Sequence, residues 1–118
     1  MSPSFVLDKN GNLMLIIGSP GGSYIITATL QTILNVFEFN MKLDQAVASS
    51  RFHHQWMPNK LAVETGGFPK SVLLDLNKIG HQVTITKNMG DIQAIGKSNK
   101  GFWVGVSDWR DVGLPLGR

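Results

Sequence analysis

Cysteine is absent from this chain of 118 residues. Its absence excludes disulfide bonds, thiol nucleophiles and thiolate metal sites, and leaves the redox compartment open. Long apolar runs are also lacking, because polar residues such as Thr27 and Gln31 interrupt the longest one, so we predict no membrane span. At Met1–Ser4 there is no basic segment followed by an apolar one, so the sequence shows no targeting signal.

Charge is scarce, at 16% of residues, whereas hydrophobic residues make up 42% of the chain, as in an ordinary globular protein. The length predicts one domain, residues 1–118. The net charge is +3, but the lysines are spread along the whole chain, which indicates a solvated surface and no nucleic-acid partner. They are Lys9, Lys42, Lys60, Lys70, Lys78, Lys87, Lys97 and Lys100.

The first half of the chain predicts a β-hairpin and two helices. Apolar runs at residues 4–8 and 13–17 flank an Asn-Gly pair, which is a strong hairpin signal. A long helix is expected over residues 24–39 with Ser23 as its N-cap, and a short one over 43–48. The apolar positions of the long helix fall on one face, which we expect to be buried. They are Ile26, Leu30, Ile33, Leu34 and Phe37.

The second half predicts a strand at 61–64, a helix from Pro69 to Ile79, and a strand at 82–86. Val72, Leu73 and Leu76 are the expected buried face of that helix. A second hairpin is expected from residues 92–96 and 102–106, followed by a loosely ordered tail, Asp108 to Arg118. The order is hairpin, long helix, short helix, strand, helix and three strands, which predicts an α+β fold.

A glycine-rich loop, Gly18-Ser19-Pro20-Gly21-Gly22-Ser23, lies between a predicted strand and the long helix. Glycines let the backbone approach a ligand closely, and the first amides of a helix have no intrahelical partner. Such a loop suits an anion site or an oxyanion hole, but glycine-rich turns between a strand and a helix are common, and by itself the pattern favours a tight turn without a ligand. No Gly-Lys-Ser/Thr follows it, so it is not a nucleotide-binding P-loop.

Other residues have the side chains of known catalytic or metal sites without the expected pattern. Ser19 or Ser23, His53 or His54, and Asp108 supply the residue types of a hydrolase triad, but no nucleophile-elbow motif accompanies them. Adjacent histidines in an extended segment point to opposite sides, and His81 is distant, so we predict structural histidines and no metal site. An aromatic cluster is expected in the core: Phe52, Trp56, Phe102 and Trp103.

Two motifs resemble the γ-glutamyltranspeptidase (γ-glutamyltransferase) family. The first is the glycine-rich loop with Ile25-Ile26-Thr27, Leu30-Gln31 and Asn35-Val36 after it. The second is Arg51-Phe52-His53-His54-Gln55-Trp56 with Pro58. Met1-Ser2-Pro3 resembles the segment after the family's paired serines, and Ser107-Asp108 with Arg110 resembles its Ser-Asp-Pro-Arg.

The resemblance implies an N-terminal-nucleophile hydrolase with an αββα sandwich. Such enzymes cut themselves, and the new N-terminal threonine of the small subunit transfers a γ-glutamyl group from glutathione or a similar donor to water or an amino acid. The resemblance places the oxyanion hole and γ-glutamyl binding at the backbone N–H groups of Gly21 and Gly22. It implies no cofactor, and a periplasmic or secreted location for a full-length member.

The departures from the family pattern set the expected role of this chain. The nucleophilic threonine, the paired serines and the large subunit have no counterpart in it; Tyr24 stands where many members have Arg, and Trp109 replaces a Pro. The resemblance therefore implies the C-terminal part of a small subunit, inactive in isolation and prone to self-association through uncovered strand edges. The alternative is a non-catalytic interaction domain or the remnant of a truncated gene.

Overall fold

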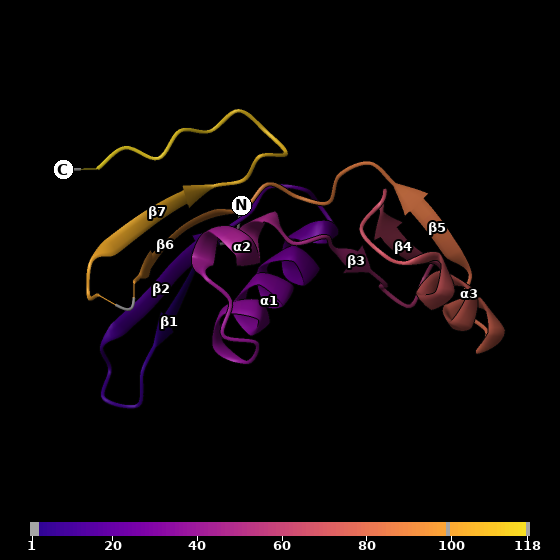
Figure 1. Ribbon diagram of the computed structural model, residues 1–118, viewed down its shortest axis with the longest axis horizontal. Coiled ribbons are helices and arrows are strands. Elements are labelled where there is room, and N and C mark those ends of the chain that lie inside the picture. The colour runs from indigo at the N-terminus through magenta and orange to yellow at the C-terminus, as the bar shows by residue number, and fades with distance from the viewer. Residues whose placement is uncertain (1–2, 99, 118) are drawn as a thin grey trace.

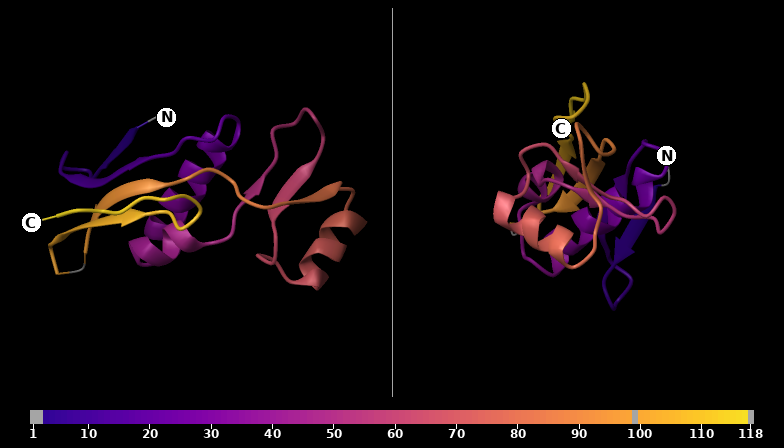
Figure 2. Two further views of the ribbon diagram at one scale, coloured as in Figure 1. Left: turned by 90° about the horizontal axis from the view of Figure 1, so that it is seen from above. Right: turned by 90° about the vertical axis from the view of Figure 1, so that its right-hand side faces the viewer.

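A computed structural model describes residues 3–98 and 100–117. Their strands form two separate sheets, one of four strands in the order β1-β2-β6-β7 and one of three in the order β3-β4-β5 (Figure 1). The two sheets lie one after the other along the long axis of a molecule that measures 47 × 31 × 25 Å (Figure 2). We call the part around the four-stranded sheet the large lobe and the part around the three-stranded sheet the small lobe.

The large lobe begins with the predicted hairpin, formed by β1 (Ser4–Leu7) and β2 (Leu13–Gly18). The carboxylate of Asp8 organises its turn, because Oδ1 accepts hydrogen bonds from the backbone N–H groups of Asn10 and Asn12, each at 2.8 Å. Gly11 has φ +82°, the left-handed conformation that the Asn-Gly signal predicts. The hairpin prediction is confirmed.

The second hairpin, β6 (Gln93–Lys97) and β7 (Trp103–Ser107), completes the same sheet. β6 pairs antiparallel with β2, so that Ile16 lies opposite Ile95 and Ile17 opposite Ala94. Hairpins from the two ends of the chain therefore share one sheet, and the observed strands lie one residue later than the sequence predicted.

Helices α1 (Tyr24–Phe37) and α2 (Leu43–Ala48) pack on one face of this sheet (Figure 1). The core lies between sheet and helices. It contains Leu15, Ile17, Ala28, Val47, Ile92 and Ala94. Ser23 occupies the N-cap of α1 as predicted, but its side chain makes no capping hydrogen bond.

The prediction of the buried face of α1 is wrong for most of its residues. The helix turns Ala28, Thr29 and Thr32 toward the core, whereas Ile26 is 75% exposed and Leu30 is 51% exposed. Small side chains let the helix lie close to the sheet, and this close approach decides which face is buried. Of the predicted stripe, only Ile33 packs against the core cluster.

The small lobe contains β3 (Phe52–His53), β4 (Leu61–Glu64), β5 (Val83–Thr86) and α3 (Lys70–Lys78). β4 and β5 are parallel, with α3 as their connection. The side-chain amide of Gln31 in α1 makes the two hydrogen bonds to β3 that a neighbouring strand would make. It donates to the Phe52 carbonyl at 2.7 Å and accepts from the Phe52 N–H at 3.1 Å. The sequence indicated an extended segment here but no strand.

Three further expectations are wrong in whole or in part. In α3, Leu73 and Leu76 are half-buried as expected, but Val72 is exposed. The expected aromatic core is absent, because all four of its members, Phe52, Trp56, Phe102 and Trp103, are exposed. The tail after residue 107 is not loosely ordered throughout, since Asp108 is buried.

Within the described ranges, no helix has the length and apolar character that crossing a membrane requires.

The packing of α1 predicts opposite sensitivities for two neighbouring positions. Ala28→Leu should lower the free energy of unfolding by about 1–3 kcal/mol, because it overpacks the helix–sheet interface. Leu30→Ala should change it by less than about 1 kcal/mol, because much of that side chain is exposed. Urea denaturation at low micromolar protein measures both values, and the reverse order of sensitivities would contradict the observed orientation of α1.

Candidate functional site

The glycine-rich loop joins the end of β2 to the start of α1, and two of its glycines adopt conformations that side chains disfavour. Gly21 has φ +131° and Gly22 has φ +60°. A Cβ added to Gly21 would lie 2.9 Å from the Cα of Gly90, so the backbones pack directly against one another there. At Gly22 nothing lies within 4 Å of an added Cβ, so the space beside this residue is open.

Ser19 fixes the loop from beneath. It is fully buried, and its hydroxyl donates to the carbonyl of Pro20 at 2.6 Å and accepts from the N–H of Asp91 at 3.0 Å. Gly90 has φ +70°, and a Cβ there would lie 2.7 Å from this hydroxyl. The segment Gly90–Asp91 is therefore the support on which the loop rests.

The amides of Gly21 and Gly22 are available to a ligand. Both residues are exposed, and in the part of the chain that the structure describes neither N–H donates a hydrogen bond. Their carbonyls, by contrast, accept from Tyr24 and Ile25, each at 3.2 Å, as α1 begins. Two free amides at the positive end of a helix form an arrangement that can bind a negatively charged oxygen.

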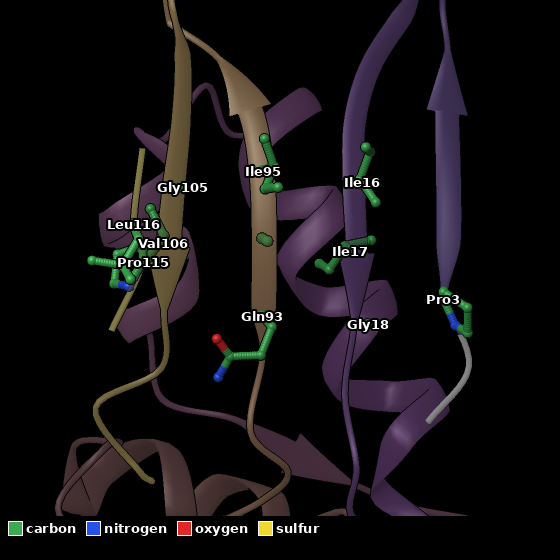
Figure 3. Close-up of a pocket in the computed structure, with 11 residues that line it drawn as sticks. Pro3, Ile16, Ile17, Gly18, Gln93, Ile95, Gly105, Val106, Pro115 and Leu116 are labelled. Atoms are coloured by element: carbon green, nitrogen blue, oxygen red, sulfur yellow. The ribbon is translucent and has the colours of Figure 1, made fainter. Parts of the chain in front are cut away.

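Gly18, the first residue of the loop, also lines a hollow of about 350 Å³ on the sheet face away from the helices (Figure 3). Most of its lining is apolar and comes from β2, β6 and β7, with Gln93 as a polar side chain. Pro115 and Leu116 of the C-terminal segment border it beside β7 (Figure 3).

Next to the glycine loop, four charged side chains form a buried charge cluster between the two lobes. Its members are Arg51, Glu64, Asp108 and Arg110, whose side chains are at most 5% exposed. Asp108 binds Arg51 at 2.7 Å and Arg110 at 2.9 Å, and Glu64 accepts from Arg110 Nε at 2.7 Å. Two positive and two negative charges make the cluster neutral, which permits its burial.

Backbone groups satisfy many of the remaining donors and acceptors of the cluster. The Glu64 carboxylate accepts from the N–H groups of Arg51 at 2.9 Å and Met89 at 2.8 Å. The Arg51 guanidinium donates to the carbonyls of Met89 at 2.7 Å and Val47 at 2.8 Å. The cluster therefore ties the end of α2, both sheets and the segment before Gly90 to one another.

The pKa values of the cluster follow from this arrangement. Burial by itself would raise the pKa of Asp108, but the hydrogen bond from the Ile92 N–H and the charge of Arg51 outweigh it, so this pKa is lowered. Burial lowers the pKa of Arg51 despite the nearby Asp108. The pKa of Arg110 is raised, because its hydrogen bonds to Glu64 and Asp108 outweigh the effect of burial.

The residue types of a hydrolase triad are not brought together. Asp108 belongs to the charge cluster, and Ser19 is committed to Pro20 and Asp91. The ring nitrogens of His53 lie 2.9 Å from Thr27 Oγ1 and 3.2 Å from Gln55 Oε1.

The second histidine is also bonded within its own loop. His54 lies 3.0 Å from Asn59 Oδ1 and accepts from the N–H of Trp56 at 3.2 Å. Both histidines of the pair therefore have structural partners, as the sequence predicted. Among the described residues, no three or more His, Asp or Glu side chains gather as a metal site would require.

Sequence reasoning noted Arg51 and Arg110 only as parts of motifs and missed the charge cluster. One signal was present: these two are arginines in a chain where most basic residues are lysines. Arginine suits buried pairing better than lysine, because its planar guanidinium presents several donors at once. The acidic partners gave no such signal, because Glu64 is the last residue of an ordinary strand.

Comparison with known proteins assigns the chain to a family. A family model described as gamma-glutamyltranspeptidase matches residues 1–117. The chain belongs to the γ-glutamyltranspeptidase family. The resemblance seen in the two sequence motifs is thereby confirmed.

Individual relatives agree with the assignment. The glutathione hydrolase proenzyme of Escherichia coli (strain K12) is 41% identical over 95% of this chain and 19% of its own length. A Helicobacter pylori γ-glutamyltranspeptidase mutant superposes with a TM-score of 0.87 at 45% identity, over 94% of this chain and 61% of its own. The Pseudomonas nitroreducens γ-glutamyltranspeptidase complexed with L-DON superposes with a TM-score of 0.89 at 36% identity, over 100% of this chain and 62% of its own.

These neighbours are N-terminal-nucleophile hydrolases, so the expected α+β fold, as part of an αββα sandwich, is confirmed. The chain spans about a fifth of the length of the curated γ-glutamyltranspeptidase relatives, 19% and 22% for two of them.

Removing one acid from the buried charge cluster should destabilise the protein. We expect Asp108→Asn to cost about 3–5 kcal/mol at neutral pH, because it leaves Arg51 buried without its counter-charge. Asp75→Asn is the matched control, since the Asp75–Lys78 pair is exposed, and it should cost less than about 1 kcal/mol.

The pH dependence of stability tests the same cluster. The pKa of Asp108 is lowered in the folded state, so its stabilisation is present at neutral pH and is lost as the pH falls below about 4. The difference between wild type and Asp108→Asn in urea denaturation should therefore shrink between pH 7 and pH 3. A constant difference over that interval would contradict the assigned ionisation.

The two loop glycines should differ in their tolerance of a methyl group. Gly22→Ala should cost about 1–2 kcal/mol, because it places Ala in a left-handed conformation with open space around it. Gly21→Ala should cost about 3 kcal/mol or more, since the contact with Gly90 adds overpacking to the backbone strain. Thermal unfolding of the two variants measures the difference in stability. An equal loss of stability in both variants would contradict the close contact between Gly21 and Gly90.

Proposed function

We propose that this chain supplies the oxyanion-binding loop, and part of the scaffold, of an enzyme that transfers γ-glutamyl groups from glutathione or a similar donor. The observation that supports the proposal is the pair of free amides at Gly21 and Gly22, exposed at the start of α1 and held by Ser19 and Gly90. Membership of the γ-glutamyltranspeptidase family supplies the substrate class.

In this mechanism a hydroxyl oxygen attacks the γ-carbonyl carbon of the donor, and the carbonyl oxygen becomes negatively charged. The N–H groups of Gly21 and Gly22 donate hydrogen bonds to that oxygen as its charge develops. The tetrahedral intermediate then collapses: the C–N bond breaks, the amine leaves with a proton, and a γ-glutamyl ester remains on the enzyme. Water or an amino acid amine then attacks this ester and regenerates the hydroxyl.

Ser19 does not supply the attacking hydroxyl. Ser19 is buried and hydrogen-bonded on both sides, so its oxygen cannot reach a bound donor. The family's nucleophilic threonine, which precedes the matched motifs, is the expected attacking group. We therefore expect this chain by itself to show no turnover of a γ-glutamyl anilide.

The partners follow from the same proposal. In a complete enzyme the chain contacts the segment that carries the nucleophile and the large subunit, in a periplasmic or secreted protein. Alone, it associates with itself through uncovered apolar surface. A non-catalytic interaction domain or gene remnant is not favoured, because similarity to glutathione hydrolases extends over nearly the whole chain.

A chimera tests the catalytic role. The corresponding segment of the E. coli glutathione hydrolase proenzyme is replaced by these residues, and hydrolysis of a γ-glutamyl anilide is measured. We expect an active chimera, and a loss on the order of 100- to 1000-fold in turnover for Gly22→Pro, which removes one oxyanion donor.

Gly66→Pro in the same chimera is the matched control. Gly66 also has a positive φ, +71°, with nothing within 4 Å of an added Cβ, but it lies in the small lobe after β4. Its variant should keep turnover within about threefold of the parent chimera if the Gly22 effect is oxyanion binding. Equal losses in both variants, or full activity with Gly22→Pro, would exclude Gly22 as an oxyanion donor.

A further inference from the structure

The side chain of Ser19 sets the direction of one of the two free amides. Its hydroxyl donates to the carbonyl oxygen of Pro20 at 2.6 Å. The peptide unit that carries this carbonyl also carries the N–H of Gly21, and it is trans. In a trans peptide unit the C=O and the N–H point in opposite directions. The bond to Ser19 therefore turns the Gly21 N–H away from the buried hydroxyl.

The neighbouring amide is fixed in a different way. The Gly22 N–H belongs to the peptide unit whose carbonyl, that of Gly21, accepts a hydrogen bond from the N–H of Tyr24 at 3.2 Å. Tyr24 is the first residue of α1, so the backbone of the helix holds this unit. Ser19 thus does for the Gly21 amide what the helix does for the Gly22 amide.

The peptide unit between Pro20 and Gly21 has no backbone partner that could replace the hydroxyl. Among the described residues, no backbone N–H donates to the Pro20 carbonyl. Gly21 adds no restraint, because without a Cβ it adopts φ values that other residues avoid, +131° in this loop. The freedom that lets the loop approach a ligand closely would also let this unit rotate. Rotation would point a carbonyl oxygen at the bound anion in place of the N–H.

Ser19 is itself held in one orientation. It is fully buried, and its oxygen accepts from the N–H of Asp91 at 3.0 Å, which leaves the hydroxyl hydrogen for Pro20. Gly90 leaves room for this arrangement, since a Cβ there would lie 2.7 Å from the hydroxyl oxygen. All of these contacts are made within this chain, so they need no segment of the longer relatives.

We propose that Ser19 is a positioning residue for the γ-glutamyl transfer reaction. Its hydroxyl orients the peptide unit between Pro20 and Gly21 so that the Gly21 N–H faces the developing oxyanion. This inference rests on the proposed function and adds to it a residue that touches neither the donor nor the attacking group. Sequence reasoning weighed Ser19 as a triad nucleophile, and its burial and two hydrogen bonds assign it this other task.

An oriented amide acts on the transition state more than on the bound donor. Negative charge on the carbonyl oxygen of the donor develops as the nucleophile attacks, so the hydrogen bond from the amide strengthens at that point. Loss of its orientation should therefore lower kcat and leave KM nearly unchanged. A general disturbance of the donor site would raise KM as well.

Ser19→Ala in the chimera with the E. coli enzyme tests this role. Hydrolysis of a γ-glutamyl anilide is measured per mole of processed enzyme, so that poor folding or processing lowers the yield and not the measured kcat. We expect kcat to fall on the order of 10- to 100-fold, a smaller loss than for Gly22→Pro, with KM within about twofold of the parent chimera. Ser19→Thr keeps the hydroxyl and should retain kcat within about threefold.

Thr32→Val is the matched control for the loss of a buried hydroxyl. Thr32 is 1% exposed, and its Oγ1 donates to the carbonyl of Ala28 at 2.9 Å within α1, away from the glycine loop. The variant loses the same kind of bond as Ser19→Ala, so the chimera that carries it should also lose thermal stability. Its kcat should nevertheless stay within about twofold of the parent chimera, because no peptide unit of the loop is released.

The outcomes separate this inference from the proposal on which it rests. Full turnover in Ser19→Ala, or a loss that Ser19→Thr or Thr32→Val shows equally, would overturn the positioning role and leave the oxyanion role of the loop standing. A rise in KM without a fall in kcat would also overturn the positioning role. Full turnover in Gly22→Pro would instead overturn the oxyanion role of the loop, and this inference with it.

Discussion

The structure depends on one electrostatic constraint: two arginines and two acids are buried together and must neutralise one another. Arg51 immediately precedes β3 and Glu64 ends β4 of the small lobe, whereas Asp108 and Arg110 follow β7, the last strand of the large lobe. Each ion would be costly to bury by itself, so the arrangement is stable only when all four are in place. Because these groups come from the small lobe and from the segment that follows β7, their pairing fixes how the two lobes meet, and we propose that the lobes fold as one domain.

The glycine loop takes its shape from the same constraint. Met89 is held from both sides, its N–H by Glu64 and its carbonyl by Arg51. The next residue, Gly90, packs against Gly21, and Asp91 bonds to Ser19 beneath the loop. A short path of contacts therefore leads from the charge cluster to the two free amides. The cluster acts on the proposed chemistry as a positioning element, since it contacts the support of the loop and not the bound oxygen.

The uncovered apolar surface is explained by the greater length of the other members of the family. This chain spans about a fifth of the length of its curated relatives, and the exposed side of α1 and the edge of β1 lie together. In a complete enzyme such surface is expected to be covered by other parts of the polypeptide. In the isolated chain this surface is exposed, which is the basis of the proposed self-association. Self-association and family membership are thus consistent with one another.

The sequence by itself determined the local structure and the family. An Asn-Gly pair specifies a hairpin through backbone geometry alone, and the bounds of α2 and β4 agreed with its local patterns. The two motifs identified the family because they are specific strings of residues. The tertiary structure alone decided which face of α1 is buried, since periodicity identifies an apolar stripe but not the surface that covers it. It also decided that Asp108 and Arg110 are buried in ion pairs, whereas the local pattern predicted a loosely ordered tail there. Arg51 lies 57 residues from Asp108 and Glu64 lies 46 residues from Arg110 along the chain, and only folding brings such charges into contact.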